Sequence, residues 1–439
     1  MARWTLEQVL AAAPDDSARK AAKGLTSPRH WSDLGSTESL LWGKCQGSGK
    51  DPYQVSVDLN GPAFRCTCPS RKFPCKHGLA LMLMWAANDG SVIDVQEVSA
   101  FAAEWAAERD QKSVKAVAKA ERLASGEDTV DPEAKAKREA KRASLIDAGV
   151  ADLERWLCDV VRQGTAAVRS QPYSFWDQPA ARLVDAQAPG LAEQVRALAT
   201  VAARPNWSDA LLRSLSRLMA ITAAWARREQ LDEPALAELR RVIGWARQSD
   251  EVLSGGTTED EWTICGRTQE TNGTIATQRT WLWSHGNQDW SVQLDTAVGN
   301  TNFSAGHGVG MGLRGRAALY PGLPPRRLLA VVVEPTSPQK ALPGALSLTE
   351  AVTKFASVLA ANPWAGPIPA TIGDLALVST DEGLHVQDNN RNILRLDPLF
   401  EPWMMVALTG MRKCDVFGEW HEDGFYPLAV SLDGEVVTV

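Results

Sequence analysis

The stretch FRCTCPSRKFPCKHGLALMLMW, residues Phe64 to Trp85, holds three of the seven cysteines and one of the six histidines of the 439-residue chain. Cys66 and Cys68 are two residues apart at the end of a predicted strand, where side chains two apart point to the same face. Their thiols can therefore bind one ion. Cys75 and His77 have the same spacing, but on a regular helix it would turn them about 200° away from each other. We therefore expect this second pair in a turn or at the very start of a helix.

Six residues separate the two pairs, enough for a loop that folds back and brings them together. Pro74 suits the approach to a helix, and the apolar run LALMLMWAA that follows predicts a buried helix. Three thiolates and one imidazole make a tetrahedral zinc site, with metal–ligand distances of about 2.3 Å and 2.0 Å. Because protein side chains take all four positions, such a site is closed and structural.

Other chemistries explain the cluster less well. A catalytic zinc site keeps one position open and uses a general base, and no glutamate lies near the cluster in the sequence. The other cysteines, at positions 45, 158, 265 and 414, are scattered singly, as in a reducing compartment. A redox pair of Cys66 and Cys68 would leave Cys75 and His77 unexplained. We predict that these four residues bind one structural zinc ion.

The pattern Cys66-x-Cys68, six residues, then Cys75-x-His77 is preceded by a strand with an aromatic residue and followed by a Leu-rich helix. It resembles the SWIM zinc finger over about residues 42–85. The resemblance implies two strands and a helix around one zinc ion, in a module that binds DNA or another protein. Bacterial SWIM proteins of this kind are commonly encoded beside MoxR-type AAA ATPases and von Willebrand A domain proteins, so the resemblance also implies such partners.

Basic residues surround the predicted ligands, and no acidic residue lies between Phe64 and Leu83. These basic residues are Arg65, Arg71, Lys72 and Lys76. With the positive end of the following helix, they favour a phosphate backbone as target, bound with salt-sensitive affinity and without base readout. The same cations could instead offset the charge of a zinc–thiolate site or pair with acids of another domain. Nucleic acid and protein both stay open as targets of the module.

Composition limits the function classes. The formal net charge of -7 argues against a protein that coats nucleic acid along its whole surface, so a polyanion site must be local. No run of eighteen apolar residues occurs, which predicts no membrane span, and the N-terminal segment lacks the long apolar core of a signal peptide. With the single cysteines, these features predict a cytoplasmic protein.

Four segments of different pattern predict an α+β multidomain fold. Residues 1–100 contain the small zinc-bound strand-strand-helix module, and the Ala-, Lys-, Arg- and Glu-rich residues 101–145 predict a charged helical linker. Apolar stripes at helical spacing predict a helical bundle over residues 146–253. Strand-like segments separated by Gly, Asn, Asp and Pro predict a β-rich domain over residues 254–439, with one helix that starts at the capping box Ser347 to Glu350.

A glycine-rich segment in the β-rich domain offers a weaker candidate site. Gly310, Gly312 and Gly315 have the spacing of a dinucleotide fingerprint, but the prolines soon after them stop the long helix that the fingerprint requires. We expect a flexible glycine loop there. Three nearby side chains could still line an anion site: His307, Arg314 and Arg316.

The sequence contains no nucleophile elbow, P-loop or paired-carboxylate motif. We therefore expect a non-enzymatic adaptor that contacts nucleic acid or protein partners through its zinc module. The alternative is that the β-rich domain carries an unrecognised enzymatic or ligand-binding activity, which the zinc finger targets.

Overall fold

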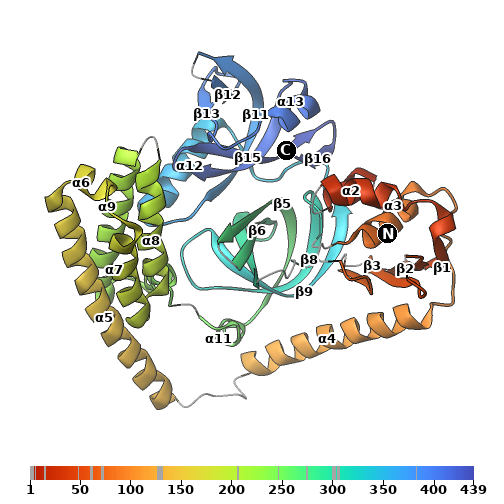
Figure 1. Ribbon diagram of the computed structural model, residues 1–439, viewed down its shortest axis with the longest axis horizontal. Helices are drawn as coiled ribbons and strands as arrows, with labels where there is room; N and C mark the ends of the chain where they lie inside the picture. The colour runs from red at the N-terminus through yellow and green to blue at the C-terminus, as the bar shows by residue number, and fades with distance from the viewer. Residues whose placement is uncertain are drawn as a thin grey trace.

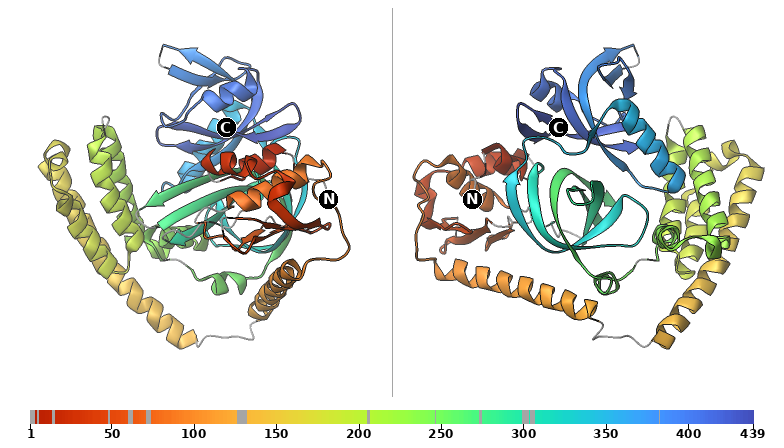
Figure 2. Two further views of the ribbon diagram at one scale, coloured as in Figure 1. Left: turned by 45° about the vertical axis from the view of Figure 1, so that its right-hand side comes forward. Right: turned by 180° about the vertical axis from the view of Figure 1, so that it is seen from behind.

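A computed structural model of the chain describes residues 4, 6–13, 16–47, 49–59, 63–70, 74–125, 132–204, 207–245, 247–272, 275–298, 303, 307–381 and 383–439. A β-barrel lies at the centre, with an N-terminal module on one side and a helical bundle on the other (Figure 1). A C-terminal sheet lies against a third side, and the view from behind shows the same arrangement (Figure 2). The predicted α+β multidomain fold is confirmed.

The N-terminal module is an antiparallel sheet of four strands in the order β1-β2-β3-β4. These are β1 (Trp31–Ser36), β2 (Leu40–Cys45), β3 (Tyr53–Asp58) and β4 (Ala63–Cys66), accompanied by the helices α1 (Leu6–Ala11), α2 (Asp16–Lys23), η1 (Pro28–His30) and α3 (Lys76–Ala87). Strand β1 was not expected, because its sequence WSDLGS lacks the apolar alternation that predicts a strand.

Both faces of this sheet are covered. Leu41 and Val55 belong to the core that includes α3, whereas Trp42 packs with Trp105 in helix α4 (Ala100–Ala124). The first turns of α4 are therefore not the exposed linker that the charged composition of residues 101–145 predicts. Phe101, Ala102, Trp105 and Ala106 pack against the sheet, whereas Ala103 and Glu104 between them are exposed.

The helical bundle has one continuous apolar core with Trp176, Leu191 and Leu211 among its buried residues. Its helices are α5 (Pro132–Gln163), α6 (Thr165–Arg169), α7 (Tyr173–Asp185), α8 (Pro189–Ala203), α9 (Trp207–Ala226) and α10 (Glu233–Ile243), with η2 (Arg228–Gln230) between the last two. Helix α11 (Ser249–Leu253) leads from the bundle to the barrel.

The barrel closes from five strands in the order β5-β6-β7-β9-β8. They are β5 (Thr258–Asn272), β6 (Ile275–Ser284), β7 (Asp289–Val298), β8 (Met311–Leu319) and β9 (Arg326–Pro338). Neighbours are antiparallel except β7 and β9, which are parallel where Ser291 pairs with Arg326. The predicted glycine loop is only partly correct, because Gly310 lies in a turn but Gly312 and Gly315 lie within β8. A Cβ atom on Gly315 would clash with the carbonyl oxygen of Val332, so glycine permits close approach of β9.

The C-terminal sheet runs in the order β13-β12-β11-β14-β15-β16, with β10 paired in parallel to β11. Its elements are β10 (Ala345–Leu346), α12 (Leu348–Ala361), β11 (Ile368–Thr380), β12 (Gly383–Gln387), β13 (Ile393–Arg395), α13 (Trp403–Thr409), β14 (Cys414–His421), β15 (Gly424–Leu432) and β16 (Glu435–Thr438). Ser347 and Glu350 form the predicted capping box of α12. Only one helix was predicted here, and the second helix, α13, was missed. Its seven residues are too few to show a helical periodicity in the sequence.

Apolar cores connect these parts of the chain. The core of the N-terminal module is continuous with the barrel interior, which includes Ile264 and Leu313. Trp290 of the barrel packs against Phe417 of β14, with ring centroids 4.9 Å apart. Among the described residues, no helix combines the length and apolar character needed to cross a membrane.

Candidate metal centre

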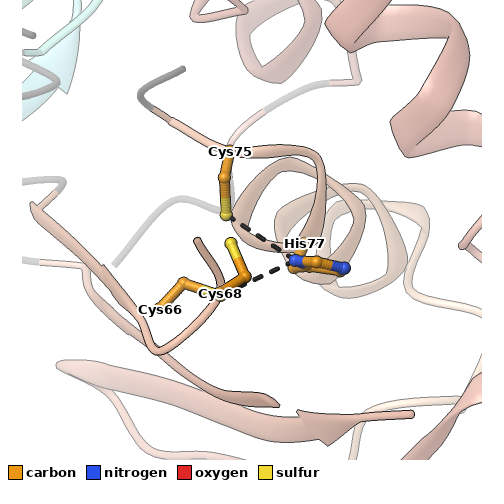
Figure 3. Close-up of side chains that lie close together, drawn as sticks. All are labelled: Cys66, Cys68, Cys75 and His77. Carbon is orange, nitrogen blue, oxygen red and sulfur yellow. Dashed lines mark hydrogen bonds between the residues drawn. The ribbon is translucent and has the colours of Figure 1, made fainter. Parts of the chain in front are cut away.

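The four predicted ligands come from two neighbouring elements of the N-terminal module. Cys66 is the last residue of β4 and Cys68 follows in a bend, while Cys75 precedes α3 and His77 lies in its first turn. Their side chains converge on one point (Figure 3). The prediction that the second pair lies at the very start of a helix is confirmed.

The ligand atoms have the spacing of a metal site. One ligand atom from each residue lies within 4.8 Å of the other three. Cys66 Sγ is 3.7 Å and Cys75 Sγ 4.0 Å from Nδ1 of His77, so the imidazole faces the sulfurs through that nitrogen. Three sulfur atoms and one nitrogen atom form a donor set that suits tetrahedral structural zinc.

Backbone pairing positions the first two cysteines. Cys66 is paired with Val55 of β3 in the sheet. Beyond the strand, the Thr67 amide donates to the Gln54 carbonyl over 3.1 Å, and the Gln54 amide donates to Thr67 Oγ1 over 3.0 Å. These bonds continue the pairing by one residue, so the chain that leads to Cys68 is held at a fixed place.

The start of α3 positions the other two ligands. Cys75 is the N-cap residue, and its carbonyl accepts the Leu79 amide over 3.0 Å. The His77 ring lies against Tyr53, with centroids 5.0 Å apart. A Cβ atom on Gly78 would lie 2.7 Å from Cδ1 of Phe64, so glycine allows α3 to approach β4. Neither Tyr53 nor Gly78 was predicted as part of the site, although a glycine next to a predicted ligand was a usable sequence signal.

Interactions within the ligand cluster shift the pKa values of Cys66, Cys68 and His77 in different directions. Hydrogen bonds with Cys66 and Cys75 lower the pKa of the Cys68 thiol. The hydrogen bond between Cys66 and Cys68 raises the pKa of the Cys66 thiol. Burial lowers the pKa of His77, but the interactions with Cys68 and Cys75 outweigh it and raise the pKa to about 9. A thiolate and a protonated imidazole thus lie together, and a metal ion that binds here displaces protons.

Burial supports a structural role for the site. Cys75 and His77 are buried, while Cys66 and Cys68 are half-buried. With all four tetrahedral positions supplied by protein side chains, an ion here has no open position for water or substrate.

The predicted basic residues are only partly described. Arg65 is exposed on β4, with Nη1 3.9 Å from Oε2 of Glu108 in α4, and Lys76 is exposed at the first position of α3. Arg71 and Lys72 lie outside the described residues. The two described cations therefore flank the ligands on the two elements that carry them.

The predicted anion site in the β-rich domain does not form. Arg314 pairs with Glu261, and Arg316 Nη1 lies 2.9 Å from Oε1 of Glu121. His307 is buried, and burial together with the charge of Arg267 lowers its pKa to about 4. Each of the two arginines is already neutralised by its own carboxylate.

Two family models match the chain. Residues 53–86 match the SWIM zinc finger, and residues 141–243 match the SWIM-associated four-helix bundle domain. No curated protein and no solved structure matches significantly. The first match spans all four ligands, and the second spans most of α5 and the helices through α10. The chain therefore carries a SWIM zinc finger, whose Cys66, Cys68, Cys75 and His77 suit the zinc ion that this family binds, together with a SWIM-associated four-helix bundle domain.

Proposed function

We propose that the protein is a cytoplasmic, non-enzymatic adaptor that contacts a nucleic acid or protein partner through residues 69–74, the loop that joins the two ligand pairs of its zinc module. The burial of α3 carries the proposal. This helix is buried from His77 to Trp85, between the sheet and the helices α1 and α2. A helix covered in this way cannot enter a DNA major groove, so contact must run through the loop and the flanking cations.

The closed donor set supports the non-enzymatic role. A zinc ion with four protein ligands holds a fold together and has no position at which to activate water. Zinc binding adds to the stability that the N-terminal sheet and α3 gain from their buried core. The zinc ion thus fixes the two ends of the segment that joins the ligand pairs, at Cys68 and Cys75.

The cations that flank the ligands favour a negatively charged partner surface. Lys76 is exposed, and no ion pair involves it among the described residues. The pair of Arg65 with Glu108 is exposed and 3.9 Å long, so it holds Arg65 only weakly. Either a phosphate backbone or an acidic protein surface can form ion pairs with these cations. A MoxR-type AAA ATPase and a von Willebrand A domain protein are the protein partners to test first.

Charge reversal separates the two kinds of partner. We expect Lys76→Glu, and Arg71→Glu with Lys72→Glu, to weaken duplex DNA binding and lower the salt slope by about 0.9 per lost phosphate contact. Lys112→Glu, exposed in α4, is the matched control and should change neither quantity. If DNA binding is absent or insensitive to these changes, affinity capture from native extract should recover the ATPase or the von Willebrand A domain protein with the unaltered chain and not with the variants. If the variants keep both DNA binding and the protein partner, the proposal is contradicted.

A further inference from the structure

A cavity of about 310 Å³ lies between the helical bundle and the barrel, two parts that lie side by side in Figures 1 and 2. Its lining comes from α5, α10, α11, β7, β9 and the turn between β8 and β9. Small-ligand sites of this size commonly lie where two domains meet. A second cavity of about 130 Å³ shares Arg241, Leu294, Tyr320 and Arg327 with the first and continues along β6 and β7.

Positive side chains outnumber negative ones in the larger cavity. Five lining residues are cationic and two are acidic: Lys135, Arg240, Arg241, Arg247 and Arg327 against Glu139 and Glu251. Ion pairs neutralise three of the cations. Lys135 Nζ lies 2.7 Å from Glu251, Arg241 bonds to Glu238 through both carboxylate oxygens, and Arg247 pairs with Glu233 over 3.3 Å.

Arg240 and Arg327 differ from these three. Neither has a carboxylate partner among the described residues. The buried Nε of Arg240 has no hydrogen-bond partner in the described part of the chain. There, the one side-chain hydrogen bond that Arg327 donates goes to the Leu294 carbonyl, over 3.3 Å. Planar guanidinium groups without a carboxylate are suited to bind phosphate oxygens.

Aromatic rings stand beside both arginines. The guanidinium of Arg240 lies 4.7 Å from the ring of Trp245, and that of Arg327 lies 4.5 Å from the ring of Tyr320. Leu294 of β7 adds an apolar surface to the same cavity lining. Aromatic and apolar walls next to cations suit a ligand that combines a flat ring with a phosphate group.

The barrel topology points to the same ligand class. Counted within the barrel, its strands close in the order one-two-three-five-four. Five-stranded Greek-key barrels of the OB type bind oligonucleotides on the face of strands two and three and with the loop between strands four and five. In this chain those elements are β6, β7 and the turn at Tyr320, and they line the two cavities.

We propose that the cleft between the bundle and the barrel binds a nucleoside phosphate, as a nucleotide unit of a single-stranded nucleic acid. Arg240 and Arg327 bind the phosphate groups, while Tyr320 and Leu294 contact the base. This site is separate from the zinc module, so it gives the chain a second point of contact with nucleic acid.

Anisotropy of a fluorescent oligothymidylate of about ten nucleotides tests the site in the full-length protein, because single OB-type sites span about 4 to 16 nucleotides. We expect Tyr320→Ala to weaken binding about tenfold through loss of stacking. Arg240→Gln and Arg327→Gln should each weaken binding and lower the salt slope by about 0.7, the value for one phosphate contact to a single strand. Arg155→Gln and Arg314→Gln are matched controls, exposed on the bundle and the barrel, and should change nothing.

Competition with a mononucleotide identifies the source of the nucleoside phosphate. If the mononucleotide displaces the oligonucleotide at similar concentrations and depends on the same arginines, the site binds free nucleotides and the ligand class is upheld. Hydrogen exchange of the unaltered protein should also show protection at residues 237–245 and 320–327 when oligonucleotide is added. This measurement does not depend on the folding of any variant. Absence of binding, absence of protection there, or binding lost only with Lys76→Glu in the zinc module overturns the proposal. The last result would leave the function proposed for that module intact.

Discussion

Cys66 Sγ lies 3.7 Å from Nδ1 of His77, which joins the end of β4 to the first turn of α3. Loss of zinc should therefore separate the helix from the sheet. We expect Cys75→Ser to destabilise the N-terminal module and to increase hydrogen exchange in α3 and β4. Because this core continues into the barrel, exchange should also rise at barrel residues near Leu313, while the bundle with its own core stays protected.

The matched control for that change is Cys158→Ser, since Cys158 is a single half-buried cysteine of α5, far from the cluster in sequence. It should leave zinc content and the exchange of α3 unchanged. Equal effects of the two substitutions would contradict a special role for the cluster.

Gly78 tests the close approach of α3 to β4. Gly78→Ala places a Cβ atom 2.7 Å from Cδ1 of the Phe64 ring, so the helix or the ring must shift. We expect a loss of about 1–3 kcal/mol in the free energy of unfolding of the module, as for other overpacked cores, measured by urea titration. Gly49→Ala, where no atom lies within 4 Å of the new Cβ, should change the free energy by less than about 0.5 kcal/mol. The reverse order of the two effects contradicts this account of the contact.

Glu419 links the C-terminal sheet to the barrel. It is buried and accepts hydrogen bonds from Trp281 Nε1 over 2.5 Å and from His421 Nε2 over 2.9 Å, with Arg279 at 3.3 Å. Glu419→Gln removes the buried negative charge and leaves Arg279 and His421 without their carboxylate partner. The loss should cost about 3 kcal/mol and lower the thermal unfolding temperature of this part of the chain. Glu422→Gln weakens only a 3.6 Å pair with the half-buried Arg217, which keeps its hydrogen bonds to the Trp364 and Ala365 carbonyls, and should cost less than about 1 kcal/mol.

The same group makes stability depend on pH. Burial raises the pKa of Glu419, but the bond with His421 and the charge of Arg279 outweigh it, and the folded pKa is below its ordinary value of 4.5. Its stabilisation is present above pH 4.5 and is lost as the pH falls through the folded pKa. Burial lowers the pKa of His421, but the interaction with Glu419 outweighs burial, and the folded pKa lies above 6.5. The stabilisation from His421 is therefore lost as the pH rises through its folded pKa. The difference in unfolding temperature between the wild type and Glu419→Gln should be largest between pH 4.5 and 6.5, and a flat difference would contradict this.

The zinc site was predictable from the sequence because its spacing is local. The pairs Cys66 with Cys68 and Cys75 with His77 each span three residues, and strand or helix geometry limits where they can point. The SWIM resemblance and the division into helical and β-rich parts rest on patterns of the same short range.

Contacts between distant segments could not be predicted in this way. The parallel pairing of Ser291 with Arg326 closes the barrel across 35 positions and leaves no periodic signal in either strand. The packing of Trp105 on Trp42, and the meeting of Arg240 and Tyr320 in the cleft, likewise depend on how whole elements pack together. The charged composition of residues 101–145 correctly favours helix but does not show which turns are covered.

X-ray absorption at the zinc edge, combined with the metal content of the purified chain, tests the central claim most directly. A closed structural site predicts one zinc ion per chain with three sulfur ligands at about 2.3 Å and one nitrogen ligand at about 2.0 Å. Two sulfur ligands with a bound water oxygen, or a chain that purifies folded without zinc, would contradict it.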